Sequence, residues 1–300
     1  MILDKVEQVV KSRYGKFAET GGSKESLWPS KQLSGSGYAV GQGLYSPEIL
    51  SVVPEIALNL SRGCGNPTGF ASLQTGDVVV DFGCGGGIDI VLAAHKVGEH
   101  GKVIGIDFSP EMIGRAKQAV AESGLQERNI ELRVGDMGQS NIPDGFADVV
   151  ISNCVINLCP DKEAIYEEAF RILRSGGRLA ISDIVLTEDI DSQRRGRFQS
   201  TWSGCLGGAI LENDYWQTVN KAGFTEVQIV SSHTLTFEEL NAMACCPGEE
   251  FTPAPAEEDL AAVQGKVMSV KFTAIKPSSI AKNVKKAAPM SRLSTEDVME

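Results

Sequence analysis

Apolar runs rich in β-branched residues alternate along the chain with segments whose apolar residues recur at helical spacing. This alternation is typical of βαβ units and of a mostly parallel sheet. The predicted strands lie at 77–82, 102–108, 130–136, 147–153, 177–185, 225–230 and 266–275, and the predicted helices at 1–15, 88–98, 109–124, about 161–173, 212–222 and 236–244. The pattern therefore predicts an α/β fold with a seven-stranded, mostly parallel sheet and helices on both faces.

Composition narrows the classes of partner. The chain has 300 residues, 42% of them hydrophobic, which is enough to bury a sizeable core. A formal net charge of -11 disfavours nucleic acid or anionic lipid as a partner, because binding to a polyanion needs a basic surface. The sequence has no run of about 18 apolar residues, so it predicts no membrane span. Residues 1–15 carry too many charges for a signal peptide, and we therefore expect a cytoplasmic protein.

A glycine-rich turn follows the first predicted strand. It spells D-x-G-x-G-x-G from Asp81 to Gly87, and the dinucleotide fingerprint would need Gly or Ala where Ile88 stands. The second strand ends in Asp107, where a carboxylate can accept both hydroxyls of a ribose, and Asp136 ends the third, where an adenine amino group can be read. Three such features at consecutive strand ends resemble the class I S-adenosylmethionine-dependent methyltransferases over roughly 70–275, which implies a Rossmann-like fold.

The sequence offers no obvious general base for a methyl acceptor that carries a proton. His95, His100 and His233 all lie away from the strand ends where a base is expected, and we interpret them as surface residues. The fourth strand is followed by Asn153 and Cys154 in place of the Asn/Asp-Pro-Pro-aromatic motif of many amino-group methyltransferases. These observations favour an acceptor that needs no general base.

Seven cysteines in a chain without an export signal favour reduced thiols over a disulfide framework. Cys64, Cys154 and Cys205 stand beside glycine or at a strand end, too far apart in sequence for a zinc knuckle but able to converge at the sheet edge. Cys84 and Cys159 are interpreted as structural. The role of the adjacent Cys245 and Cys246 is left open between binding of a thiophilic ligand and no function. The roles of Trp202 and Tyr14 are left open between lining the site and packing in the core.

The segments GCGNP, ISNCVINL, CLGGA and RYG together resemble arsenite S-adenosylmethionine methyltransferases. The resemblance implies that Cys64, Cys154 and Cys205 bind trivalent arsenic, whose lone pair attacks the methyl group directly, for detoxification. Soft thiolates suit such a soft centre, and a lone pair carries no proton, which explains the missing base. Many relatives carry a further cysteine upstream of the position of Cys64, which this sequence lacks. The group that reduces the oxidised enzyme or product is therefore left open: either Cys64 pairs with Cys154, or external thiols act as the reductant.

The resemblance also implies the remaining site and partners. The residues expected to hold S-adenosylmethionine are Asp81, Gly83, Gly85, Gly87, Asp107, Met112, Asp136, Met137 and Asn153, with Asp81 supporting the loop electrostatically. Arsenite and methylated arsenite are the expected substrates, glutathione or thioredoxin the expected reductant, and a monomer the expected state. The expected division is an N-terminal segment carrying Cys64 (1–69), a cofactor-binding domain (70–185), an arsenic-binding, sheet-completing segment (186–276) and a disordered tail (277–300).

Two other functions fit parts of the pattern. A methyltransferase of a small molecule with a carbon or oxygen acceptor would share the cofactor half, and its three cysteines would be replaceable. A thiol-based metalloid-binding module that retains the fold would bind arsenite tightly without turnover. The acidic run at 257–259 is predicted to be a solvated surface.

Overall fold

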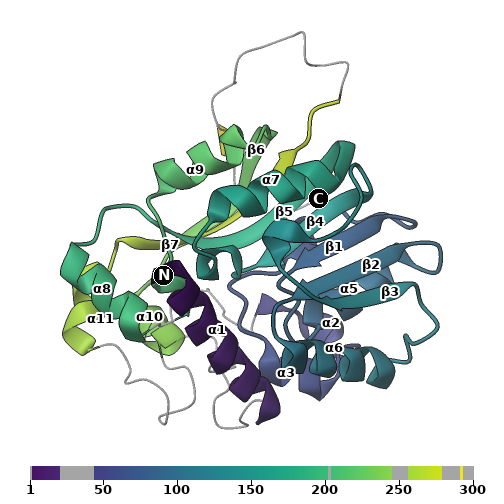
Figure 1. Ribbon diagram of the computed structural model, residues 1–300, viewed down its shortest axis with the longest axis horizontal. Coiled ribbons are helices and arrows are strands. Elements are labelled where there is room, and N and C mark those ends of the chain that lie inside the picture. The colour runs from purple at the N-terminus through teal and green to yellow at the C-terminus, as the bar shows by residue number, and fades with distance from the viewer. Residues whose placement is uncertain (1, 21–43, 202–203, 245–255, 279–290, 293–300) are drawn as a thin grey trace.

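The computed structural model describes residues 2–20, 44–201, 204–244, 256–278 and 291–292, and these residues form one mixed sheet flanked by helices (Figure 1). The strands are β1 (Val78–Phe82), β2 (Lys102–Asp107), β3 (Ile130–Val134), β4 (Ala147–Asn153), β5 (Leu173–Leu186), β6 (Thr225–Thr234), β7 (Val267–Ile275) and β8 (Ser291–Arg292). They are ordered β3-β2-β1-β4-β5-β7-β6-β8. The first five are mutually parallel, whereas β7 is antiparallel to both β5 and β6. The predicted α/β fold and its seven strands are confirmed.

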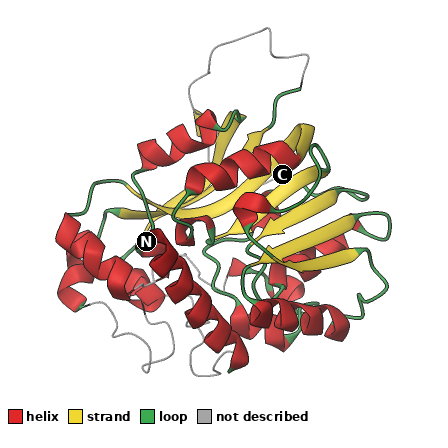
Figure 2. Cartoon of the chain, in the orientation of Figure 1, coloured by secondary structure: helices red, strands yellow, loops and turns green. Residues whose placement is uncertain are grey.

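Helices cover both faces of the sheet (Figure 2). They are α1 (Ile2–Glu19), α2 (Pro47–Leu50), α3 (Glu55–Leu60), α4 (Pro67–Phe70), α5 (Ile88–Val97), α6 (Pro110–Glu122), α7 (Lys162–Ile172), α8 (Ser192–Thr201), α9 (Glu212–Lys221), α10 (Phe237–Ala244) and α11 (Glu257–Val263), with short 3-10 turns η2 (Met137–Gln139), η3 (Ile156–Leu158) and η4 (Gly204–Leu206). The cores under α7 and α9 on one face and under α5 and α6 on the other are separate clusters. The central strands are buried because both faces are covered, which explains their nearly continuous apolar sequence.

Helix α6 shows how local sequence sets an element boundary. The Ser109 side chain accepts a hydrogen bond from the backbone N–H of Met112, and Pro110 occupies the first helical position, as predicted. Helix α1 packs against this helix, because the Arg115 guanidinium donates hydrogen bonds to the carbonyls of Ala18 and Glu19 at the end of α1. These contacts place the N-terminal helix beside the loops that follow β1 and β2.

The structure differs from the sequence prediction in several places. Helices α2, α3, α4, α8 and α11 were not predicted. Asp259, in the acidic run expected to be solvated, is buried and accepts a hydrogen bond from Arg197 Nε at 2.7 Å. The ion pair explains how a carboxylate is buried there. Two residues of the predicted disordered tail, Ser291 and Arg292, form β8 against β6, while 279–290 and 293–300 lie outside the described residues.

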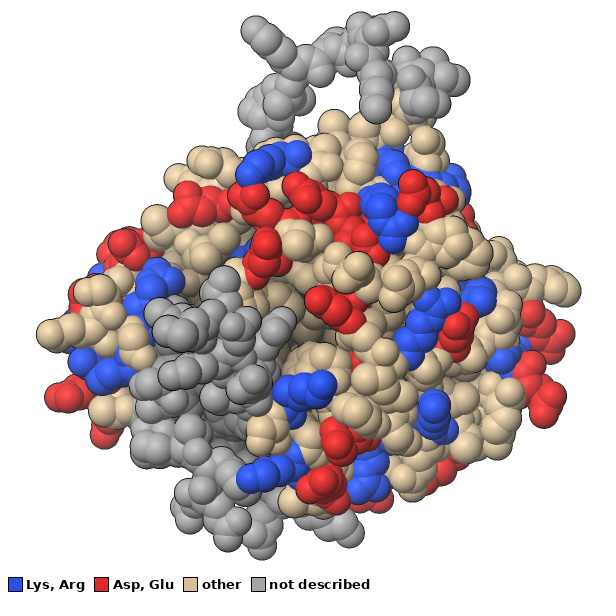
Figure 3. Space-filling model, viewed as in Figure 1, with Lys and Arg blue, Asp and Glu red and all other residues tan. Residues whose placement is uncertain are grey.

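Charges of both signs are spread over the face seen in Figure 3, with acidic side chains gathered over α7 and α9. Glu163, Glu167 and Asp214 are exposed on these helices. Among the described residues, no helix combines the length and apolar character needed to cross a membrane.

Candidate active site

The glycine loop between β1 and α5 forms one wall of a cavity. Gly83 and Gly85 both have left-handed backbone conformations, with φ of +74° and +49°. A Cβ at Gly83 would lie 2.3 Å from the Val155 side chain, so only glycine fits there, whereas the space beside Gly85 is open. Gly87 was predicted to contact the cofactor but does not line the cavity. It packs against Ala116 of α6 instead, 3.1 Å from where its Cβ would be, because the helix begins at this point.

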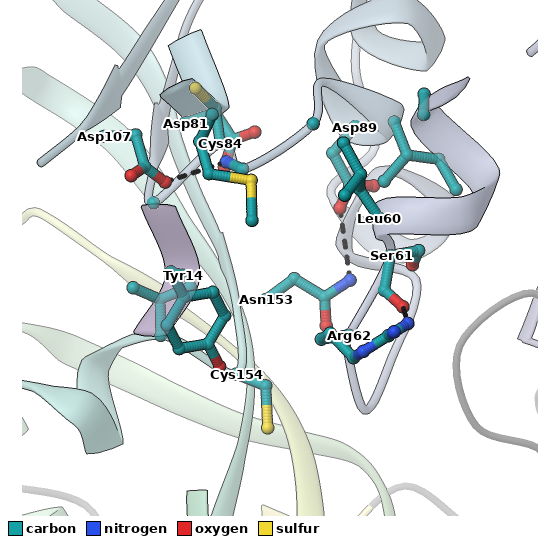
Figure 4. Close-up of a pocket in the computed structure, with 18 of the residues that line it drawn as sticks. Tyr14, Leu60, Ser61, Arg62, Asp81, Cys84, Asp89, Asp107, Asn153 and Cys154 are labelled. Carbon is teal, nitrogen blue, oxygen red and sulfur yellow. Dashed lines mark hydrogen bonds between the residues drawn. The ribbon is translucent and has the colours of Figure 1, made fainter. Parts of the chain in front are cut away.

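Asp107, at the end of β2, holds the glycine loop in place. Its carboxylate accepts hydrogen bonds from the backbone N–H groups of Gly85 and Ser109, both at 2.9 Å. Figure 4 shows Asp107 beside the glycine loop that contains Cys84. Burial raises the pKa of Asp107 to about 6, although both hydrogen bonds oppose the shift. The carboxylate lines the cavity, and its remaining lone pairs can accept donors from a ligand.

Two further carboxylates, Asp81 and Asp89, line the same cavity. Burial, followed by the charges of Asp89 and Asp107, raises the pKa of Asp81 well above its ordinary value. Burial also raises the pKa of Asp89 to about 6. The side chain of Asp81 makes no hydrogen bond with another described residue, so its carboxyl group is available to a cationic ligand. Sequence reasoning missed Asp89. Its position in the first helical turn after the glycine loop was the signal that could have identified it.

The cavity continues on the other side of Phe108 and Leu158, which line both compartments. The glycine-loop compartment measures about 70 Å³ and the second about 430 Å³, so a ligand with a bulky ring system fits the second. Its lining residues are Val10, Lys11, Phe108, Val134, Gly135, Asp136, Met137, Leu158 and Cys159. Tyr14 lines the first compartment and packs edge-on against Phe108, so α1 borders both compartments.

The other predicted cofactor residues divide between the two compartments. Met112 is buried and lines the first. Asp136 and Met137 line the second, but β3 ends at Val134, so Asp136 lies two residues beyond the strand and begins η2, where its carboxylate accepts from Gly138 N at 2.8 Å. None of the three histidines lines either compartment. His95 and His100 are exposed, and His233 is half-buried, with its Nε2 2.9 Å from Glu239 Oε2.

Three thiols from distant parts of the chain meet next to this cavity. Cys64 lies between α3 and α4, Cys154 directly follows β4, and Cys205 lies in η4; all three are buried. The Cys205 thiol donates to the carbonyl of Cys154 at 2.9 Å, and the Cys64 sulfur lies 3.5 Å from Ser182 Oγ. Burial, and then contact with the thiols of Cys205 and Cys64, raises the pKa of Cys154 well above its ordinary value.

Cys154 connects the thiol cluster to the cavity, because it belongs to both. Its backbone is left-handed, with a φ of +62°, an unusual conformation for a residue other than glycine. No disulfide joins any of the described cysteines. Cys84 and Cys159, interpreted from sequence as structural, line the first and second compartments respectively. Cys245, Cys246 and Trp202 lie outside the described residues.

Asn153, predicted to contact the cofactor, lines the first compartment, but its side chain also holds the turn that carries Cys64. Its Oδ1 accepts from the backbone N–H groups of Cys64 and Gly65, both at 3.1 Å, and its Nδ2 donates to the carbonyl of Gly65 at 2.8 Å. The same Nδ2 lies 3.1 Å from Asp89 Oδ2 and 3.3 Å from Tyr45 Oη. Asn153 therefore joins the cavity wall to the Cys64 turn.

Asp183, which sequence reasoning also missed, lies in β5 beside the thiols. Ligand atoms of Cys154, Asp183 and Cys205 all lie within 4.8 Å of one another. Burial raises the pKa of Asp183 to about 7, with backbone and Tyr215 hydrogen bonds and the charge of Lys162 opposing the shift. A carboxylate inside an apolar strand was the available signal, but the sequence does not show which side chains it faces.

Comparison with known proteins agrees with this geometry. The sequence profile of the "Methyltransferase domain" family matches residues 73–223, and the chain belongs to this family. The chain is similar to arsenite methyltransferases from Halobacterium salinarum, with 42% identity over 57% of this chain and 43% of that protein, and from Aquipseudomonas alcaligenes, with 34% identity over 64% and 56%. A human arsenite methyltransferase is 32% identical over 53% of this chain and 44% of its own length. The chain thus spans about half the length of these curated relatives.

The fold is also similar to a solved structure, an arsenic(III) S-adenosylmethionine methyltransferase from Chlamydomonas reinhardtii. The two share 27% sequence identity and a TM-score of 0.65 over 78% of this chain and 75% of that one. The Rossmann-like fold and the resemblance to arsenite methyltransferases that the sequence indicated are both confirmed.

Proposed function

We propose that this protein methylates trivalent arsenic with S-adenosylmethionine as the methyl donor. The observation that carries the proposal is the meeting of Cys64, Cys154 and Cys205 in one buried cluster beside the glycine-loop cavity. A carbon or oxygen acceptor would not need three thiols at this position. The similarity to arsenite methyltransferases supports the same substrate.

The residues of the cavity fit the cofactor by charge and by shape. S-adenosylmethionine carries a sulfonium and an ammonium group, and the buried carboxylates of Asp81 and Asp89 favour positive charge in the first compartment. The carboxylate of Asp107 would accept the ribose hydroxyls, and Gly85 leaves room for the methionine portion. The purine ring would then lie in the larger compartment, with Asp136 and Met137 beside it.

The thiols hold arsenic by exchanging its hydroxyl groups. Arsenous acid reacts with three thiols to form three arsenic–sulfur bonds, and each thiol proton leaves with a hydroxyl group as water. When bound, S-adenosylmethionine supplies an electrophilic methyl carbon for the arsenic lone pair. The protein positions the arsenic in a buried site and excludes water, and no side chain has to remove a proton from the acceptor.

Transfer of a methyl group to the lone pair formally oxidises arsenic by two electrons. Return to the trivalent state needs a two-electron reductant, and we propose an external thiol system of the glutathione or thioredoxin class, which becomes a disulfide. We also propose that the enzyme acts as a monomer in the cytoplasm, with arsenite and methylated arsenite as substrates.

The test is to identify the arsenic products formed from arsenite, S-adenosylmethionine and a thiol reductant. Wild-type protein should form methylated arsenicals, and Cys154→Ser should form none while still binding the cofactor. Arsenite binding without any product would instead indicate a metalloid-binding module. Full turnover by the Cys154→Ser variant would refute the arsenic site.

A further inference from the structure

The carboxylate of Asp183 belongs to the thiol cluster but has no part in the proposed methyl transfer. It is fully buried, and its ligand oxygen lies within 4.8 Å of the sulfur atoms of Cys154 and Cys205. Trivalent arsenic takes three thiolates and keeps its lone pair for the methyl group. An oxygen donor at this distance therefore points to a different kind of ligand.

The carboxylate is held in position and still has capacity to bind. Asp183 Oδ1 accepts from the backbone N–H of Ile184 at 3.0 Å, and Oδ2 accepts from the hydroxyl of Tyr215 at 3.1 Å. The hydroxyl of Tyr166 donates to that of Tyr215 at 2.6 Å, so a buried tyrosine pair orients the carboxylate from behind. The backbone N–H of Asn157 also hydrogen-bonds the carboxylate, which leaves one of its about four lone pairs for a cation. Such outer hydrogen bonds are typical of residues that bind metals.

Two thiols and one carboxylate form a donor set that suits borderline-soft divalent cations. Zinc is bound by cysteine sulfur and aspartate oxygen in tetrahedral sites, whereas magnesium and calcium prefer oxygen alone. The thiol of Cys64 contacts that of Cys154 but is not among the ligand atoms that all lie within 4.8 Å of one another. We propose that Cys154, Cys205 and Asp183 form a binding site for a thiophilic divalent cation such as zinc or cadmium.

The thiols lose their protons when a cation binds, and a buried lysine lies near the resulting negative charge. Each thiol that binds the cation releases its proton to the buffer, and the carboxylate binds as an anion. The ammonium group of Lys162 is buried nearby and interacts electrostatically with Asp183, Cys159 and Cys205. This positive charge offsets part of the negative charge that the thiolates and the carboxylate bring to the site.

Cation binding has a consequence for the reaction. Arsenic and the cation need the same thiols, so they cannot be bound together at Cys154 and Cys205. A thiophilic cation should therefore compete with arsenite and not with S-adenosylmethionine. This competition rests on the proposed function, whereas binding of the cation does not.

The experiment measures cadmium and arsenite binding separately, without S-adenosylmethionine. The parent protein carries Cys245→Ser and Cys246→Ser, as does every variant, so that these two thiols cannot bind either ligand. Cadmium is titrated by calorimetry and by its sulfur-to-metal charge-transfer absorbance. Asp183→Asn retains all three thiols and nearly the same shape. It should bind cadmium about tenfold or more weakly, and arsenite within about threefold of the parent protein, since even loss of an outer partner costs 10–100-fold.

Two further variants separate the outcomes. Cys154→Ser should lose both ligands, and Cys159→Ser should bind cadmium like the parent protein. Unchanged cadmium affinity in Asp183→Asn, or no stoichiometric cadmium binding by the parent, would overturn the cation site. If Asp183→Asn does not fold, cadmium is added to the parent protein with arsenite bound. Release of arsenite that a chelator reverses supports the cation site, and no release of arsenite overturns it. Cadmium binding without any arsenite methylation would refute the proposed function and leave the cation site standing.

Discussion

Replacement of Asn153 by alanine tests whether the cavity wall and the Cys64 turn are coupled. Three hydrogen bonds connect the side chain to this turn, from Cys64 N and Gly65 N to Oδ1 and from Nδ2 to the carbonyl of Gly65. Neutral hydrogen bonds contribute about 0.5–1.5 kcal/mol each, so Asn153→Ala should lower the free energy of unfolding by about 2–4 kcal/mol. Urea denaturation with linear extrapolation measures this change.

The same variant should weaken the thiol site more than the cofactor site. Without the amide, the Cys64 turn must be ordered when arsenic binds, and about 1.4–2.8 kcal/mol of ordering cost corresponds to a 10–100-fold loss of arsenite affinity. Cofactor affinity should change less, because the glycine loop is held by Asp107 and not by Asn153. Asn220→Ala, at an exposed position of α9, is the matched control and should change neither quantity. Arsenite affinity equal to that of wild type in the folded Asn153→Ala protein would refute the positioning role.

Three other predictions address the cofactor carboxylates and the division of labour among the thiols. Asp107→Ala should weaken S-adenosylmethionine binding by about 1.5–3 kcal/mol, the contribution of a hydrogen bond to a charged group, and unchanged affinity by calorimetry would contradict the ribose assignment. Asp81→Asn should raise the melting temperature of the ligand-free protein at pH 7.5 and weaken cofactor binding. The raised pKa of Asp81 means that the folded state binds its proton more tightly than the unfolded chain, so this group favours folding at low pH and loses that contribution as pH rises through its folded pKa. The rise in melting temperature caused by Asp81→Asn should therefore shrink toward pH 4. An equal rise at pH 7.5 and at pH 4 would exclude the ionisation of Asp81 as its cause. Cys64→Ser should lose activity on arsenite but keep much of it on monomethylated trivalent arsenic, which has only two exchangeable positions; equal loss in product analysis of both substrates would refute this division.

Sequence alone determined the βα order and placed several candidate site residues at one edge of the sheet. Apolar periodicity and helix caps are local, and the carboxyl ends of parallel strands share one edge of a sheet. Asp107 and Cys154 could therefore be assigned to the same edge before their contacts were known. The glycine spacing after β1 and the cysteine motifs indicated the resemblance to arsenite methyltransferases for the same reason: each is a short segment with its own chemistry.

Tertiary structure decided which side chains face one another across those segments. The carboxylate of Asp183 faces the thiols because Cys154 follows β4, which pairs with β5, and because η4 brings Cys205 to the same point. Asn153 reaches the Cys64 turn across 89 residues of sequence, and Tyr14 reaches the cavity because α1 packs on α6. Such contacts depend on strand register and helix packing, which are set by the burial of the whole core, so no local pattern in the sequence could have predicted them.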